Sequence, residues 1–194
     1  MKSARKIIYS SARIGKQVAR MGREISRAYR GQTLDVVIPL QTAFIFAADL
    51  VRHITIPVLW HFVRVETHDI EQDGHWQREI FFSERPVLKD RDVLMVDSVL
   101  VSGVTQEFLM RRLLENEPRS LRLAVLLDKP HDRKVDVQPD YFAFRAASNH
   151  VEGYGLPTGT GAQRNLPFVA AAGQTARKVR TARKPAVRSR RKTG

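Results

Sequence analysis

One short segment in the middle of the chain combines small, polar and glycine residues in the order expected of an anion-binding turn. An apolar, strand-like run at 92–97 continues into a loop that we place at 96–105 and then into a helix. Such a turn presents free backbone N–H groups and the positive end of the helix dipole. Ser102 and Thr105 add hydroxyl donors, and Gly103 supplies the turn. The segment therefore predicts a phosphate site; the alternative is that these residues only cap the helix.

The elements that must position this loop alternate between strand and helix along the chain. Helical spacing of apolar residues, short β-branched runs and turn signals give the assignments. We expect helices at 11–29, 42–53 and 105–116, and strands at 34–40, 57–66, 77–82, 92–97, 121–127 and 141–144. This order predicts an α/β fold with a mostly parallel sheet flanked by helices and right-handed crossovers.

Composition separates a folded domain from a basic tail. The 194 residues are 43% hydrophobic, enough for one α/β domain, which we place at 1–171. The net charge is +13, and 174–194 holds nine Lys or Arg and no acid, which leaves +4 on the preceding residues. We expect 172–194 to be disordered because it has too few apolar residues to offset its ordering entropy. The tail either makes nonspecific contact with nucleic acid through 174–194 or only aids solubility.

Several protein classes are disfavoured. Cysteine is absent, so disulfides, thiolate metal sites and a thiol nucleophile are excluded, which fits a reducing, cytoplasmic location. No apolar run is long enough to cross a bilayer. The basic segment 1–30 resembles a transit peptide, but we favour a surface helix of the domain. The six histidines lack the spacing of metal ligands, so no metal site is predicted from them.

Several blocks of sequence, spread over most of residues 7–169, resemble the hypoxanthine-guanine phosphoribosyltransferase family. The blocks are ISRAY (25–29), FAADL (46–50), FVRV (62–65), AVLLDKP (124–130), VEGYGL (151–156) and RNLP (164–167). The resemblance implies the type I phosphoribosyltransferase fold with a small hood over the sheet, and a homo-oligomer, either dimer or tetramer. It also implies a reaction in which a purine nitrogen attacks phosphoribosyl pyrophosphate with the help of Mg²⁺.

Within the central loop, the resemblance assigns roles to individual residues. Ser102, Gly103, Val104 and Thr105 match the cup for the 5′-phosphate. Two adjacent acids that contact the ribose in the family become Asp97 and Ser98, and the Asp that acts at the purine becomes Val101. A valine cannot move a proton, so Asp97 is the catalytic candidate that remains if the protein is active.

Outside the loop, the resemblance implies a purine site and a pyrophosphate site. Lys129 matches the lysine that recognises the purine's exocyclic oxygen, His150 takes the place of the stacking aromatic residue, and Val151 is expected beside it. Arg164 matches the arginine that contacts pyrophosphate. Gln41 lies in the family's pyrophosphate loop, where a lysine is missing.

The substitutions point to a degenerate active site. The magnesium-binding Asp aligns with Pro157, so the losses fall on metal, pyrophosphate and proton transfer. We expect a protein that binds a purine nucleotide or phosphoribosyl pyrophosphate with weak or no transferase activity, in a regulatory or sensor role. The alternatives are a working transferase of purine salvage, in which Asp97 or Asp128 replaces the missing base, and a nucleic-acid-binding accessory protein.

Overall fold

The computed structural model describes residues 5–40, 43–68, 77–82, 86–146, 150–157 and 162–172. The elements are β1 (Ile7–Tyr9), α1 (Ser11–Ala28), β2 (Leu34–Pro39), α2 (Phe44–Val51), β3 (Val58–His68), β4 (Gln77–Phe82), β5 (Asp92–Leu100), α3 (Val104–Leu114), β6 (Ser120–Asp128), the 3-10 helix η1 (Pro130–Asp132), β7 (Tyr141–Arg145), β8 (Val151–Glu152) and β9 (Val169–Ala171).

A six-stranded sheet in the order β4-β3-β2-β5-β6-β7 forms the centre of the molecule. Five of these strands are parallel, and β4 pairs antiparallel with β3 at one edge. The parallel neighbours are joined through helices or longer connections, as parallel strands require. The predicted α/β architecture, including the returning strand at 77–82, is therefore confirmed.

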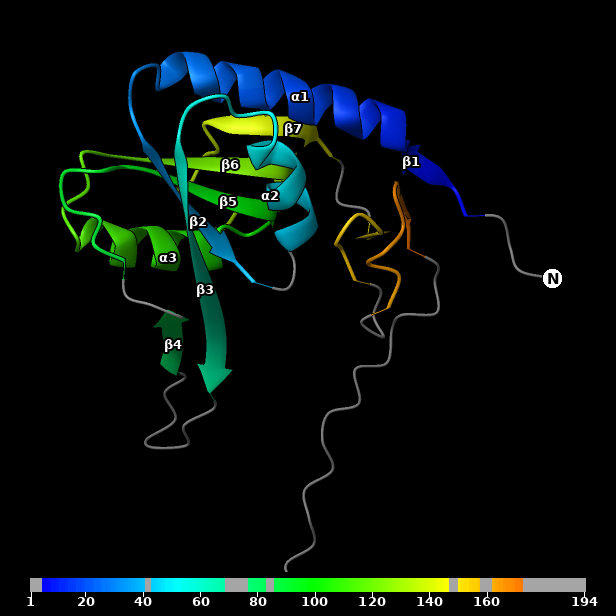
Figure 1. The fold of residues 1–194 in the computed structure, drawn as a ribbon. Coiled ribbons are helices and arrows are strands. Elements are labelled where there is room, and N and C mark those ends of the chain that lie inside the picture. The colour runs from blue at the N-terminus through cyan, green and yellow to red at the C-terminus, as the bar shows by residue number, and fades with distance from the viewer. Residues whose placement is uncertain are drawn as a thin grey trace, which may run out of the picture.

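Two apolar cores lie on opposite faces of the sheet, with α1 and α2 on one face and α3 on the other (Figure 1). Successive strand residues point to opposite faces, so Val36 packs in the first core and Val37 in the second. Helix α1 begins after Ser10, whose hydroxyl accepts a hydrogen bond from the Arg13 N–H. Among the described residues, no helix combines the length and the apolar character needed to cross a membrane.

A second, three-stranded sheet in the order β1-β9-β8 was not predicted. It joins the two ends of the described chain, because Ile7 pairs with Ala170 and Val151 with Ala171. Its strands have only two or three residues each, too few for a periodic pattern to show in the sequence. The pairing therefore depends on tertiary contacts rather than local preference.

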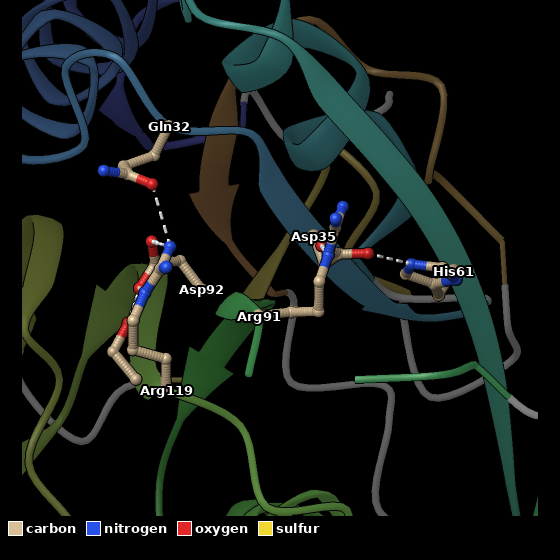
Figure 2. A network of polar contacts seen from close by, with 7 residues as sticks. Gln32, Asp35, His61, Arg91, Asp92 and Arg119 are labelled. Carbon is tan, nitrogen blue, oxygen red and sulfur yellow. Dashed lines mark hydrogen bonds and ion pairs between the residues drawn. The ribbon is translucent and has the colours of Figure 1, made fainter. Parts of the chain in front are cut away.

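A network of charged and polar side chains gathers where the parallel strands begin (Figure 2). Asp35 is buried near the start of β2 and accepts hydrogen bonds from His61 Nε2 at 2.7 Å and Arg91 Nε at 2.8 Å. Asp92, the first residue of β5, accepts from Arg119 and from the Ser120 hydroxyl. These contacts tie the amino ends of the strands together, and the predicted phosphate loop lies at the opposite end of the sheet.

Candidate functional site

The predicted phosphate loop is shorter than the sequence suggested. Strand β5 continues to Leu100, because Val99 and Leu100 pair in register with Leu127 and Asp128 of β6. Residues 98–100, which we placed in the loop, are therefore strand, and the turn is confined to 101–103. The extra pairing holds the turn rigidly at the carboxyl end of β5, where α/β proteins commonly bind their ligands.

Gly103 has the backbone conformation that the turn requires. Its φ is 80°, in the left-handed region, and it stands at the N-cap of α3 without a side chain to cap the helix. A Cβ at this position would approach Val135 Cγ2 to 2.9 Å and Arg133 Cδ to 3.2 Å. Only glycine therefore fits, and the first N–H groups of α3 lack partners within the helix, as an anion site needs.

Ser102 and Thr105 are both partly exposed on either side of Gly103. The Ser102 carbonyl accepts a hydrogen bond from the Lys134 N–H at 2.9 Å, which fixes the turn against the segment after β6. Val101 is 38% exposed, so the position that resembles the family's purine-facing Asp lies at the surface of the site. The loop offers hydroxyl and backbone donors to an anion, but no acid.

Asp97 is a buried residue of β5, four positions before the turn begins at Val101. Both of its carboxylate oxygens accept hydrogen bonds. Oδ1 accepts from the Ser98 N–H and Oδ2 from the Gln106 side-chain amide, each at 2.7 Å. Gln106 also donates to the Val99 carbonyl at 3.3 Å. The carboxylate of Asp97, the catalytic candidate, is therefore held by the backbone of its own strand β5 and by the first turn of α3.

Lys129 lies beside the loop, because its N–H donates to the Leu100 carbonyl at 3.0 Å. Its side chain is buried, and this desolvation lowers the pKa of the ammonium below its ordinary value, while the nearby Asp132 acts in the opposite direction. The two halves of the predicted site, the phosphate turn and the purine lysine, are thus brought together at neighbouring strand ends.

Asp128, the other buried acid at this edge, forms an ion pair with Arg133. Arg145 Nε lies 3.8 Å from the other Asp128 oxygen. The Arg133 side chain is 9% exposed, and its Nε and Nη1 are buried without hydrogen-bond partners within the described part of the chain. Arg133 also packs against Gly103, so the ion pair between Asp128 and Arg133 lies directly against the turn.

The remaining predicted site residues lie in and around the small sheet rather than in the loop. His150 is exposed just before β8, and Val151 begins that strand. Arg164 Nη1 donates to the Gly155 carbonyl at 2.9 Å, and the Gly155 N–H donates back to the Arg164 carbonyl at 2.8 Å. This double contact fixes Arg164 at the turn that follows β8.

A partly buried hydrogen bond joins this turn to helix α2, which packs on the main sheet. The Tyr154 hydroxyl donates to Asp49 Oδ2 of α2 at 2.6 Å. Burial and this hydrogen bond raise the pKa of Tyr154 far above its ordinary value, so the phenol remains a donor. The contact fixes the turn that carries Arg164 relative to α2.

Two predictions on site residues are not tested by these contacts. Gln41 and the tail 174–194 lie outside the described residues. Pro157, at the position of the family's magnesium-binding Asp, has no side-chain oxygen, and among the described residues no three His, Cys, Asp or Glu gather to hold a metal ion. Pro157 therefore cannot supply a side-chain ligand. Because Mg²⁺ commonly binds through one or two carboxylates together with the phosphates of its substrate, the Mg²⁺ dependence stays a prediction.

Two residues of the site were missed in the sequence. Gln106 looks like an ordinary polar residue in the first turn of a helix, and Arg133 like one of many surface cations. Only the fold shows that Gln106 holds Asp97 and that Arg133 pairs with Asp128 beneath the turn. Their spacing of nine and five residues from these partners matches no local motif.

Comparison with known proteins shows which family the chain resembles. The phosphoribosyl transferase domain family matches residues 4–157. Hypoxanthine-guanine phosphoribosyltransferase of Mycobacterium avium is 34% identical over 77% of this chain and 77% of its own length. The Dictyostelium discoideum enzyme is 31% identical over 86% of this chain and 94% of its own.

Solved structures show the same relationship. The crystal structure of a hypoxanthine-guanine phosphoribosyltransferase from Bacillus anthracis superposes with a TM-score of 0.78 at 28% identity, covering 87% of this chain and 98% of that one. The family match over residues 4–157 includes the strand, turn and helix around Gly103 as well as Lys129. The chain therefore belongs to the hypoxanthine-guanine phosphoribosyltransferase family and has the type I phosphoribosyltransferase fold.

Proposed function

We propose that this protein binds a purine mononucleotide or phosphoribosyl pyrophosphate at the 101–103 turn, the first turn of α3 and Lys129. We also propose that transfer of the phosphoribosyl group from phosphoribosyl pyrophosphate to a purine base, with release of pyrophosphate, is slow or absent. The 5′-phosphate would be held by Ser102, Thr105 and the N–H groups of the first turn of α3, with Lys129 donating to the purine oxygen. Such a protein would act as a cytoplasmic sensor or regulator of purine salvage, as a homo-oligomer.

The observation that carries this proposal is the contrast between donors and acids at the site. The donors of the turn are partly exposed, whereas Asp97 and Asp128 are buried and hydrogen-bonded within the protein. An anion gains from this arrangement because it meets N–H and hydroxyl groups at the turn, and the carboxylate in the first turn of α3, Glu107, is paired with Arg111 at 2.8 Å. Val101 carries no titratable group, so this position supplies no general acid or base for the transfer reaction.

The rival function is an active purine phosphoribosyltransferase with a replacement base. Asp128 is poorly suited to this role, since it is 1% exposed and paired with Arg133. Asp97 is the better candidate, but its carboxylate would first have to exchange the Gln106 amide for substrate. Positioning alone accelerates many reactions, so slow turnover by this route is the form that residual activity would take.

The first test is calorimetric titration with GMP, IMP and phosphoribosyl pyrophosphate, with and without Mg²⁺, together with a spectrophotometric transferase assay on the same sample. We expect binding of the nucleotides and turnover that is slow or undetectable. Fast, magnesium-dependent turnover would show that the protein is an active purine phosphoribosyltransferase and not a sensor. The absence of both binding and turnover would contradict the assignment of a nucleotide site.

Two substitutions test the residues. Thr105→Val removes a phosphate donor while keeping the size and branching of the side chain, and Lys129→Ala removes the donor to the purine oxygen. Each is expected to weaken nucleotide binding by about tenfold or more, since a hydrogen bond to a charged group contributes about 1.5–3 kcal/mol. Thr33→Val, a partly exposed threonine before β2, is the matched control. Unchanged affinity in both site variants contradicts the assignment.

A further inference from the structure

Basic residues are concentrated in two segments at the ends of the sequence. Residues 1–30 contain nine Lys or Arg against one acid, a net charge of +8, and 174–194 contain nine and none, a net charge of +9. Between them, residues 31–173 contain fifteen basic and nineteen acidic residues, a net charge of −4. The positive charge of the protein therefore belongs to its two ends and not to the part that contains the candidate site.

The described part of the first segment forms a continuous cationic stripe on α1. The buried side of the helix is made by residues such as Ile14, Val18 and Ile25, and the basic residues follow one another at alternating steps of three and four on the opposite side. The stripe is defined by Arg13, Lys16, Arg20, Arg23, Arg27 and, just beyond the helix, Arg30. Two of its members contact the rest of the domain, since Arg13 lies over the Tyr9 ring and Arg20 Nη2 donates to the Phe142 carbonyl at 3.0 Å. The other four side chains are exposed.

This stripe is unfavourable for the helix that carries it. Neighbouring like charges three or four residues apart destabilise a helix, and a cation near the amino end opposes the helix dipole. Within the stripe, Arg20 pairs with Glu24 at 2.8 Å, but Lys16, Arg23 and Arg27 are exposed and form no ion pair with another described residue. Helix stability does not explain these residues, so an external anion is the more economical explanation.

The small sheet brings the last described residues before the second basic segment close to the start of α1. The Ala171 N–H donates to the Lys6 carbonyl at 2.9 Å, and β9 pairs with β1, which leads directly into α1. Residues 171–172 therefore lie beside the segment that precedes the cationic stripe, although more than 140 residues separate the two basic segments in the sequence.

We propose that the cationic stripe of α1 is a docking surface for the phosphate backbone of a nucleic acid duplex. From Arg13 to Arg27 the stripe is about 21 Å long at about 1.5 Å per residue, which matches roughly six phosphate steps of one strand along the duplex axis. Arginine is well suited to this contact because its planar guanidinium donates two parallel hydrogen bonds to phosphate. The rings that Arg13 contacts, Tyr9 and Phe144, are buried and offer no stacking surface, so the contact reads the backbone and not the bases.

A membrane surface fits the same helix less well. Membrane-bound amphipathic helices bury an apolar face in the bilayer, but the apolar face of α1 is already packed against the sheet. The only large apolar side chain that is well exposed in residues 5–30 is Ile7, which precedes the helix. Binding to anionic lipid is therefore an alternative outcome of the test.

The test measures binding of the full-length protein to fluorescent duplex DNA and duplex RNA of about 20 base pairs by anisotropy, over a range of salt concentrations. The test variant is Lys16→Gln/Arg23→Gln/Arg27→Gln. The matched control, Lys89→Gln/Arg111→Gln/Arg112→Gln, removes the same charge from exposed positions before β5 and on α3. Removing three phosphate contacts should weaken binding at least tenfold and lower the slope of log affinity against log salt by about 2–3.

Both variants should retain nucleotide binding, since neither triple removes a residue of the candidate site. The α1 triple should be slightly more stable than the wild type because like charges are removed, whereas the control triple breaks three exposed ion pairs, to Glu117, Glu107 and Glu115, and should lose little stability. Equal affinity of the two triples for duplex overturns the proposal and leaves the tail alone as the contact. Loss of binding to anionic vesicles in the α1 triple, without any duplex binding by the wild type, overturns it in favour of a membrane. The result does not depend on whether the protein is a transferase.

Discussion

The two ends of the parallel sheet bury acids in different ways. At the amino ends of the strands, Asp35 and Asp92 meet arginines that remain partly in solvent, since the side chains of Arg91 and Arg119 are 37% and 52% exposed. At the carboxyl ends, Asp97 accepts from the buried Gln106 amide, and Asp128 pairs with Arg133, whose side chain is 9% exposed. The exposed Arg145 lies farther from Asp128, at 3.8 Å.

This difference separates a structural region from a functional one. The amino-end network joins strands through cations that water can still solvate, so each pair adds modest stability. At the carboxyl end, Arg133 pairs with the Asp128 charge, the Asp97 carboxylate accepts hydrogen bonds from neutral donors, and the 101–103 turn itself contains no acid. We expect such a site to favour binding of an anion over transfer of a proton.

The largest expected effect comes from Asp128→Ala. It leaves the Arg133 guanidinium buried and unpaired, and breaking such a buried pair costs about 3–5 kcal/mol in the free energy of unfolding. Asp35→Ala, at the other end of the sheet, should cost less, because the partly exposed Arg91 can be solvated. Urea unfolding of both variants measures the difference, and Asp128→Ala/Arg133→Met should recover much of the loss. Equal costs at the two ends would remove the distinction between them.

The next effect is a gain in activity. Val101→Asp restores an acid at the exposed edge of the turn, at the position that resembles the family's purine-facing Asp. General acid–base catalysis contributes about 10²–10⁴-fold, so kcat for IMP or GMP formation should rise by about 10². Val101→Asn has nearly the same shape without the acid and should not raise kcat. A wild-type rate already typical of enzymes, unchanged by Val101→Asp, would mean that another group supplies the proton transfer.

The order of the main elements could be predicted because each leaves a periodic signal. Helix α1 and strands β2 and β6 bury regular sets of apolar residues, and every strand of the main sheet was expected. The strands of the small sheet have two or three residues and pair across the whole chain, so no local pattern could reveal them. For the same reason, the link between the tail and the start of α1 became visible only in the fold.

The composition of the candidate site could be predicted more fully than its electrostatics. The small residues of the turn and Lys129 were recognisable as motifs, and the fold places them at neighbouring strand ends. Strand β5 extends to Leu100 because it pairs with β6, a contact between segments that the loop's own sequence does not encode. Similarly, Gln106 and Arg133 gain their roles from partners that only the tertiary structure brings near.

A smaller effect concerns the pH dependence of nucleotide binding. Burial lowers the pKa of Lys129, so its ammonium loses its proton at a lower pH than an exposed lysine, whose pKa is about 10.4. If the ammonium donates to the purine oxygen, IMP affinity is full below the lowered pKa and falls, up to about tenfold, as pH rises through it. Calorimetry between about pH 7.5 and 10 tests this. Lys129→Met should bind weakly without that slope, and a slope that persists in Lys129→Met assigns the titration to another group.

The smallest effect is expected at the amino ends of the strands, from Asp92→Asn. The hydrogen bond from Arg119 lowers the pKa of the Asp92 carboxyl, partly offset by burial. A lowered folded-state pKa means that the stabilisation is present above the unfolded value of about 3.9 and is lost as pH falls through the folded value. Asp92→Asn should therefore be less stable than the wild type at neutral pH, with the gap closing in acid. Urea unfolding from about pH 7 to 3 measures that gap, with the exposed neighbour Asp90→Asn as the control. A stability difference that is constant over the whole pH range would show that the Asp92 charge contributes nothing to its contact with Arg119. The contact at the amino end of the sheet would then depend on packing and neutral hydrogen bonds.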